Sequence, residues 1–178
     1  MLAGDARRLP LGCRDARCPP RVLLAALEQV IPDSRHAHTI AALRCFRGID
    51  TLTAAGLCAE VGDWQRFRSK QLSGFLGVVP TEYTSDLKRR QGSITKAGSS
   101  HARRLLVEAA HHYRHHPAVS EELACRQRGQ DPRVIEIAWR AQRRLHQRWT
   151  ALRAQRHKPA GVVAIACAAF CWEAAVLN

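Results

Sequence analysis

Hydroxyl groups and cations alternate in the middle of the chain, in the stretch 77–104, GVVPTEYTSDLKRRQGSITKAGSSHARR. The hydroxyl groups belong to Thr84, Ser85, Ser93, Thr95, Ser99 and Ser100, and the cations are Lys88, Arg89, Arg90, Lys96, Arg103 and Arg104. This combination suits phosphodiester chemistry, because a serine can attack phosphorus while fixed cations stabilise the added negative charge of the transition state. A lone hydroxyl is a poor nucleophile, so a base or a metal must come from elsewhere. The alternative is a basic loop that only binds backbone phosphates.

A second group of cations occupies 140–158, where no acidic residue falls between Ile137 and Lys158. Its members are Arg140, Arg143, Arg144, Arg148, Arg153, Arg156 and Lys158. Arg140, Arg144 and Arg148 recur every four residues, so on a helix they form one row beside an apolar stripe. Unpaired cations in a row repel one another, which a bound polyanion explains better than stability does. A solvated helix face is the alternative.

Two further patterns concern a glycine and four histidines. Residues 40–62 look like a helix-hairpin-helix, in which Gly48 would permit the tight turn and the amides that start the second helix would face a DNA phosphate. Asp50 places a carboxylate at that position, so a plain corner capped by Asp50 is the alternative.

The histidines form two i, i+4 pairs, a spacing that can chelate a transition metal: His111, His112, His115 and His116. They lack the partners of a familiar metal motif, so we expect a polar helix end before Pro117 and no metal site.

Helices must position these groups, because apolar residues recur at spacings of three and four and few strand patterns are present. The sequence therefore predicts an all-α fold. We expect a poorly ordered leader and short helix over 1–35 and one helical domain over 36–178. The domain would contain the helix-hairpin-helix-like corner (40–62), the serine-bearing basic loop (77–100), a helix starting near residue 101, the basic helix (133–155) and a C-terminal helix (162–176).

The composition narrows the classes of partner that this chain could bind. The chain has 28 Lys and Arg against 15 Asp and Glu, a formal net charge of +13, and its hydrophobic fraction of 46% is that of a folded domain. Such charge favours nucleic acid, with an acidic membrane surface as the competitor. The longest charge-free apolar stretch, 160–172, is too short to span a bilayer. The seven cysteines show no paired C-x-x-C spacing and the first residues lack a signal-peptide core, so we expect reduced thiols in a cytoplasmic protein.

Four segments in order resemble one known family. They are RGIDTLTAAGLCAEVGDWQRF (47–67), QLSGFLGVVPTEYTSD (71–86), RRQGSITKAGSSHARRLLVEAAHHYR (89–114) and IAWRAQRRLHQRW (137–149). Over about residues 36–170 the chain resembles the C-terminal domain of bacterial insertion-sequence transposases of the one-ten type, the family that includes the pilin-gene invertase. Four ordered motifs are more specific than any one of them.

The resemblance implies a DNA transposase or recombinase and assigns residues to it. The family's G-L-V-P-S-E stretch, a variable residue and S-S-G fall on Gly77–Asp86, which makes Ser85 the implied nucleophile and Thr84 its substitute. Lys96, in an I-T-K-x-G stretch, and Arg103 and Arg104 would hold the phosphate or strand. The chain departs from the pattern where Asp86 replaces glycine and where the family's A-R-E-L-A-G-F-x-W helix is shortened to ACAAFCW (166–172).

The complete family members also carry an N-terminal RuvC-like domain with four acidic metal ligands. The 35 residues before the match are too few for that domain, so we expect a truncated transposase that binds DNA but is inactive alone. No cofactor is expected in this chain, and Mg²⁺ is expected only with a RuvC-like partner domain. The implied partners are DNA, an element-encoded RNA and further copies of the chain, with no membrane. The alternative is a non-catalytic nucleic-acid-binding module that modulates transposition.

Overall fold

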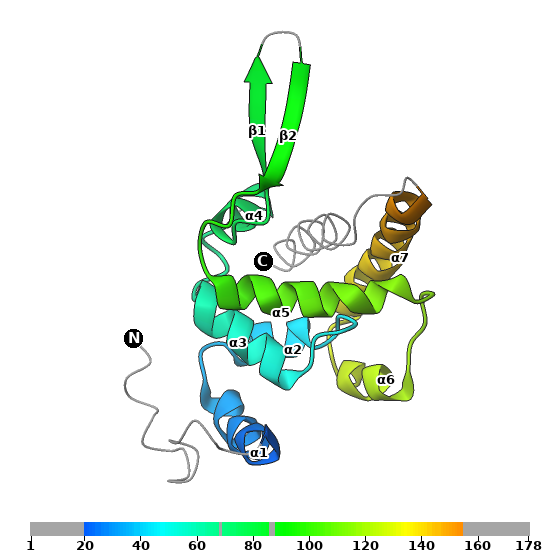
Figure 1. Cartoon of the computed structure of the whole chain (residues 1–178). Coiled ribbons are helices and arrows are strands. Elements are labelled where there is room, and N and C mark those ends of the chain that lie inside the picture. Colours follow the sequence, from blue (N-terminus) through cyan, green and yellow to red (C-terminus); the bar gives the residue numbers. More distant parts are fainter. Residues whose placement is uncertain (1–19, 68, 86–87, 155–178) are drawn as a thin grey trace.

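Helices form most of the fold, which confirms the all-α class expected from the sequence. The computed structural model describes residues 20–67, 69–85 and 88–154 (Figure 1). The elements in order are α1 (Pro20–Val30), η3 (Ile31–Asp33), α2 (Ala37–Leu43), α3 (Thr51–Val61), α4 (Ser69–Phe75), β1 (Pro80–Ser85), β2 (Lys88–Ile94), α5 (Ser100–His111), η4 (His112–Arg114), α6 (Glu121–Gln127) and α7 (Pro132–Ala154). The expected C-terminal helix at 162–176 and the first 19 residues of the leader lie outside the described residues.

The core forms where α5 meets its neighbours. Figure 1 shows α5 running across the middle of the helical body, with α3 along it and α7 at its C-terminal end. Leu43, Phe46, Leu57, Leu106 and Leu145 are fully buried, and they come from α2 and the turn after it, α3, α5 and α7. Burying an aliphatic or aromatic side chain contributes about 1.5–3 kcal/mol, so this shared cluster holds the four helices together.

Short polar side chains cap the N-termini of α3, α5 and α6. Asp50 caps α3 by accepting a hydrogen bond from the Thr53 amide at 2.8 Å, as the sequence predicts. Ser99 caps α5 in the same way, accepting from the Ala102 amide at 3.1 Å. Ser120 caps α6, a seven-residue helix that the sequence analysis did not expect.

The expected loop at 77–100 contains a β-hairpin, which corrects the sequence prediction at this point. Strands β1 and β2 pair antiparallel, with an irregularity between Pro80 and Glu82. The hairpin projects from the helical body with its connecting turn at the far end (Figure 1). The sequence of these strands lacks the alternation of apolar and polar residues that marks a half-buried strand, so the hairpin could not be recognised from it.

None of the helices in the described ranges combines the length and the hydropathy that a bilayer-crossing helix requires.

Candidate nucleic-acid interface

Ser85 lies at the tip of the hairpin. It is the last residue of β1, and the register pairs it with Lys88, the first residue of β2. The same register pairs Thr84 with Arg89 and Tyr83 with Arg90. The backbone therefore brings the implied nucleophile level with the first of three consecutive cations. Asp86 lies outside the described residues.

The base of the hairpin is held by close contact between two backbone segments. Gly77 and Gly98 both have positive φ, at 64° and 75°. A Cβ at Gly77 would lie 2.0 Å from the Ala97 carbonyl oxygen, and one at Gly98 would lie 2.0 Å from that of Phe75. Only glycine fits at either position. Lys96, between them, has a left-handed φ of 56° and donates its amide to the Gly77 carbonyl at 3.1 Å.

Arg103 joins this base to α5. Its Nη1 donates to the carbonyl oxygens of Leu76, Ala97 and Gly98 at 3.2, 2.7 and 3.1 Å. A guanidinium group suits this position because it is always charged and carries several donors in a fixed arrangement. The contacts give Arg103 a structural role, and its implied contact with DNA stays a prediction.

Arg104, the next residue, points to solvent. Its side chain is 68% exposed, and its Nε lies 3.8 Å from Glu108 Oε1. An exposed pair of this kind contributes little, so the guanidinium is available to an anion. In the sequence, Ser85 and the cations of 77–104 form one group, but the hairpin separates Ser85 from the cations at its base. At about 3.3 Å per residue, the five steps from Ser85 to Pro80 span about 17 Å. Lys96, Arg103 and Arg104 belong to the base, whereas Lys88, Arg89 and Arg90 start at the tip.

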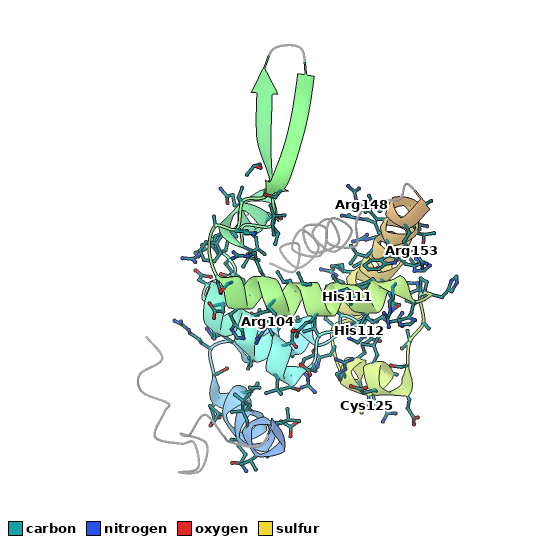
Figure 2. The ribbon with its side chains drawn as sticks, viewed as in Figure 1. Arg104, His111, His112, Cys125, Arg148 and Arg153 are labelled. Atoms are coloured by element: carbon teal, nitrogen blue, oxygen red, sulfur yellow. The ribbon has the colours of Figure 1, made fainter. Side chains whose placement is uncertain are left out.

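Arginines on α7 form the second part of the candidate interface. The buried side of this helix includes Ala138, Ala141, Leu145 and Trp149, which confirms the predicted apolar stripe. Arg140, Arg143 and Arg148 are exposed and Arg144 is half-buried. Among the described residues, no carboxylate forms an ion pair with Arg140, Arg143, Arg148 or Arg153. Figure 2 shows Arg148 and Arg153 near the C-terminal end of α7.

The corner at Gly48 is packed into the structure. Gly48 has a φ of 81°, and a Cβ there would lie 2.7 Å from the Ala109 carbonyl oxygen of α5. Side chains of α6 bind the carbonyls of the same turn: Arg126 donates to Ile49, and Gln127 donates to Cys45 at 3.0 Å. The corner therefore has a structural role, and DNA binding at Gly48 stays a prediction.

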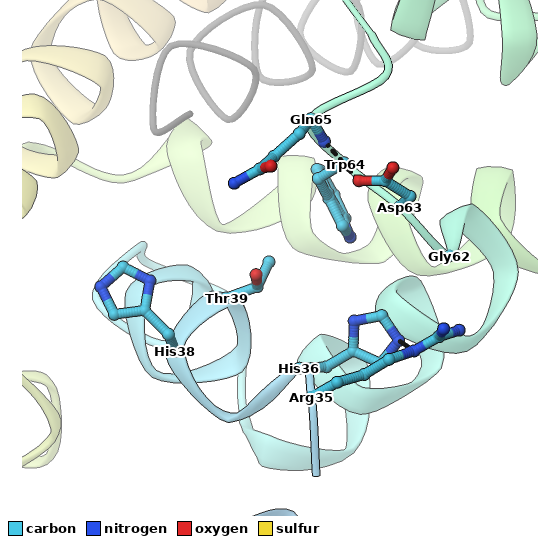
Figure 3. Close-up of a pocket in the computed structure, with 8 residues that line it drawn as sticks. All are labelled: Arg35, His36, His38, Thr39, Gly62, Asp63, Trp64 and Gln65. Atoms are coloured by element: carbon cyan, nitrogen blue, oxygen red, sulfur yellow. Dashed lines mark hydrogen bonds between the residues drawn. The ribbon is translucent and has the colours of Figure 1, made fainter.

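A pocket that the sequence analysis missed lies between the start of α2 and the end of α3 (Figure 3). Its volume is about 400 Å³, and its lining includes Arg35, His36, His38, Asp63 and Trp64. Arg35 Nε donates to His36 Nε2 at 3.0 Å. Burial lowers the pKa of His36, Arg35 lowers it further, and Asp63 acts in the opposite direction. No spacing in the sequence marks this pocket, because its residues come from separate turns.

Metal binding finds no support in the part of the chain that the structure describes. No group there of three or more His, Cys, Asp or Glu side chains could hold a metal ion. His111 and His112 lie at the end of α5 (Figure 2).

Comparison with known sequences identifies the region that contains the corner, the hairpin and α5. Residues 40–124 match the family described as Transposase IS116/IS110/IS902. A transposase-like protein of Sinorhizobium fredii, y4qE, is 39% identical over 153 residues, which cover 84% of this chain and 39% of that protein. Residues 40–124 form a transposase domain of the IS116/IS110/IS902 family.

Two other relatives of this transposase domain belong to named insertion sequences. The transposase of IS1533 from Leptospira borgpetersenii is 27% identical over 139 residues, covering 74% of this chain and 39% of the relative. That of IS1111A from Coxiella burnetii is 42% identical over 64 residues, covering 35% of this chain and 18% of the relative. The chain thus spans at most about two fifths of the length of these three relatives. The family match includes Ser85 and the hairpin base, and it ends before the α7 arginines.

Proposed function

We propose that this chain is the serine-bearing, DNA-binding part of an insertion-sequence transposase, with Ser85 as its nucleophile. The family match over residues 40–124 carries the proposal, because it contains Ser85 together with the elements that support its hairpin. Support for DNA as the partner comes from the net charge of +13 and from Arg140, Arg143 and Arg148, which are exposed and form no ion pair with a carboxylate among the described residues.

In the proposed reaction, the hydroxyl oxygen of Ser85 forms a bond to the phosphorus of a DNA phosphodiester. The bond from phosphorus to one deoxyribose oxygen breaks, and that oxygen leaves with a proton while the serine proton passes to a base. Lys88 and its two neighbours start the strand opposite Ser85, where their charge would stabilise the transition state. The described residues do not fit a metal ion, so we assign the Mg²⁺ that the family resemblance implies to a RuvC-like partner domain.

The test of DNA binding is a salt series with a fluorescent duplex. Each phosphate contact contributes about 0.9 to the slope of log K against log salt. Arg140→Gln/Arg148→Gln should therefore lower the slope by about 2 and weaken binding about tenfold at moderate salt. Arg128→Gln/Arg133→Gln removes the same charge from the C-cap of α6 and the first turn of α7, and should weaken binding less than threefold. Weak, salt-insensitive binding by the unsubstituted chain would refute the proposal.

The test of the nucleophile is a strand-exchange assay with an added RuvC-like domain. Ser85→Ala should abolish the covalent protein–DNA adduct and the exchanged product while leaving DNA affinity unchanged. Ser93→Ala is the matched control on the neighbouring strand, since only the backbone carbonyl of Ser93 binds Thr81. Equal activity of Ser85→Ala would remove Ser85 from the mechanism. Steep salt-dependent binding with no Ser85-dependent product would favour a non-catalytic nucleic-acid-binding module.

The family resemblance also leads us to propose a cytoplasmic location and two further partners, an element-encoded RNA and additional copies of this chain. Light scattering of the purified chain with and without DNA tests self-association. A constant monomer mass under both conditions would refute it.

A further inference from the structure

Histidines and arginines gather where α5 ends beside α7. We call this group the His-Arg cluster and define it as Arg47, His111, His112, Arg114, His116 and His146. Its members come from the turn after α2, from α5, from η4 and the residues after it, and from α7. Figure 2 labels His111 and His112 at this end of α5.

Contacts across these elements join the cluster into one surface. The rings of His116 and His146 lie 4.9 Å apart, which links the segment after η4 to α7. Arg47 Nη1 donates to the His116 carbonyl at 2.8 Å. His146 Nδ1 lies 3.0 Å from the Tyr113 carbonyl and must donate to it, because a carbonyl only accepts.

The charged groups around the cluster are nearly all cations. Burial lowers the pKa of His112, and Arg47, His115, Arg114 and His111 lower it further. Arg114 Nε donates to His115 Nε2 at 3.0 Å. The nearest carboxylate along α5, Glu108, lies 3.8 Å from Arg104. Among the described residues, no acidic side chain forms an ion pair with a member of the cluster.

A contribution to fold stability does not explain why these side chains lie together. Each histidine that gains a proton beside the arginines adds like-charge repulsion and so raises the free energy of the folded chain. A bound polyanion reverses that effect. The cluster also lies against α7, the helix that carries the arginine row. The ring of His111 lies 6.0 Å from the ring of Trp149, and the ring of His116 lies 4.9 Å from that of His146. A nucleic-acid backbone along α7 would thus meet the His-Arg cluster next.

We propose that the His-Arg cluster binds phosphate groups of the DNA that lies along α7, and binds them more tightly as the pH falls from about 8 to about 6. This inference rests on the proposed function. A phosphate beside an imidazole favours the protonated ring, so each histidine that contacts the backbone takes up a proton on binding and affinity rises with acidity.

The experiment measures the affinity of the full chain for a fluorescent DNA duplex at pH 6 and pH 8 at constant salt. His111→Gln/His116→Gln removes two exposed members and leaves His112, which packs on Gly48, in place. His36→Gln/His38→Gln is the matched control, with two histidines removed from the pocket at α2. If two histidines each gain about one pKa unit, affinity should be at least about tenfold higher at pH 6 than at pH 8. That ratio should fall below about threefold in His111→Gln/His116→Gln and stay unchanged in the control.

His111→Arg/His116→Arg supplies permanent charge, and should give at pH 8 the affinity that the unsubstituted chain shows at pH 6. An unchanged pH ratio in His111→Gln/His116→Gln, with steep salt dependence retained, would overturn this inference alone. Absence of salt-dependent DNA binding at either pH would overturn the proposed function as well. A pH response abolished by EDTA would indicate a metal site, and pH-dependent binding to anionic vesicles in place of DNA would indicate a membrane. Either result would overturn the inference.

Discussion

Adjacent arginines at the start of α5 should affect different properties when each is replaced by alanine. Arg103→Ala removes a guanidinium that binds three carbonyl oxygens, whereas Arg104→Ala removes one whose nearest carboxylate is 3.8 Å away in solvent. We therefore expect Arg103→Ala to lower the stability of the hairpin base. We expect Arg104→Ala to lower DNA affinity at nearly unchanged stability.

The magnitude follows from the contacts. Nη1 carries two hydrogens, so the three acceptors at 2.7, 3.1 and 3.2 Å amount to two full hydrogen bonds. A bond from a charged donor contributes about 1.5–3 kcal/mol net, and partial exposure places each near the lower end. Arg103→Ala should thus cost about 3 kcal/mol. Arg104→Ala should cost less than about 0.5 kcal/mol, as for other exposed ion pairs.

Urea unfolding followed by circular dichroism measures the global effect, and amide hydrogen exchange measures the local one. The reporters are the Lys96 amide, which donates to Gly77, and the Thr95 amide, which donates to Val79. Both should exchange faster in Arg103→Ala and at the original rate in Arg104→Ala. Equal unfolding free energies for the two variants, together with equal exchange at Lys96 and Thr95, would refute the structural role of Arg103.

Three other substitutions test the elements that carry the site. Asp50→Ala should cost about 1 kcal/mol in urea unfolding, because the Thr53 amide loses its acceptor, while Asp50→Ser should retain most of the stability. Gly77→Ala should lower the free energy of unfolding by well over about 2 kcal/mol, because the strain of a left-handed backbone adds to the overlap with the Ala97 backbone. Gly129 also has a positive φ but faces open space, so Gly129→Ala should cost only about 1–2 kcal/mol. Equal losses of stability in the two variants would contradict the close contact at Gly77. Hydrogen bonds from Ser99 and His101 lower the pKa of Glu60, so its ionised form stabilises the fold above the ordinary value of 4.5. We therefore expect the unsubstituted chain to be more stable than Glu60→Gln at pH 7, and this difference should shrink as the pH falls below 4.5. A difference that stays constant with pH would contradict this.

The parts of the fold that follow from local chemistry could be predicted from the sequence. Asp50 caps α3 because a short carboxylate before a helix reaches the free amides of its first turn. Leu145 and Trp149 are buried because a spacing of four returns residues to one helix face. Helix α6 was missed because a seven-residue helix with one fully buried side chain, Leu123, carries little periodicity.

The arrangement of the candidate site depends on contacts between distant residues, which no spacing rule reveals. Arg103 binds the Leu76 carbonyl 27 positions away, so composition alone could not distinguish it from Arg104. Gly77 and Gly98 look like ordinary loop glycines until their backbones meet. The His-Arg cluster joins Arg47 to His146 across three elements, and only the end of α5 was visible in the sequence as a run of histidines.

The hairpin is attached to the helical body only at its base, so a small rotation there displaces the tip by a larger distance. With an arm of about 17 Å, a rotation of 10° at the base moves the tip by about 3 Å. Displacement chemistry requires reacting atoms to be held within about 0.5 Å, which corresponds to less than 2° at the base. The base of the hairpin is joined to the helical body by the hydrogen bonds of Arg103 and the close contacts of Gly77 and Gly98. If Ser85 is the nucleophile, as we propose, a second contact at the free end of the hairpin, from the DNA itself or from another protein surface, would hold the tip within that tolerance.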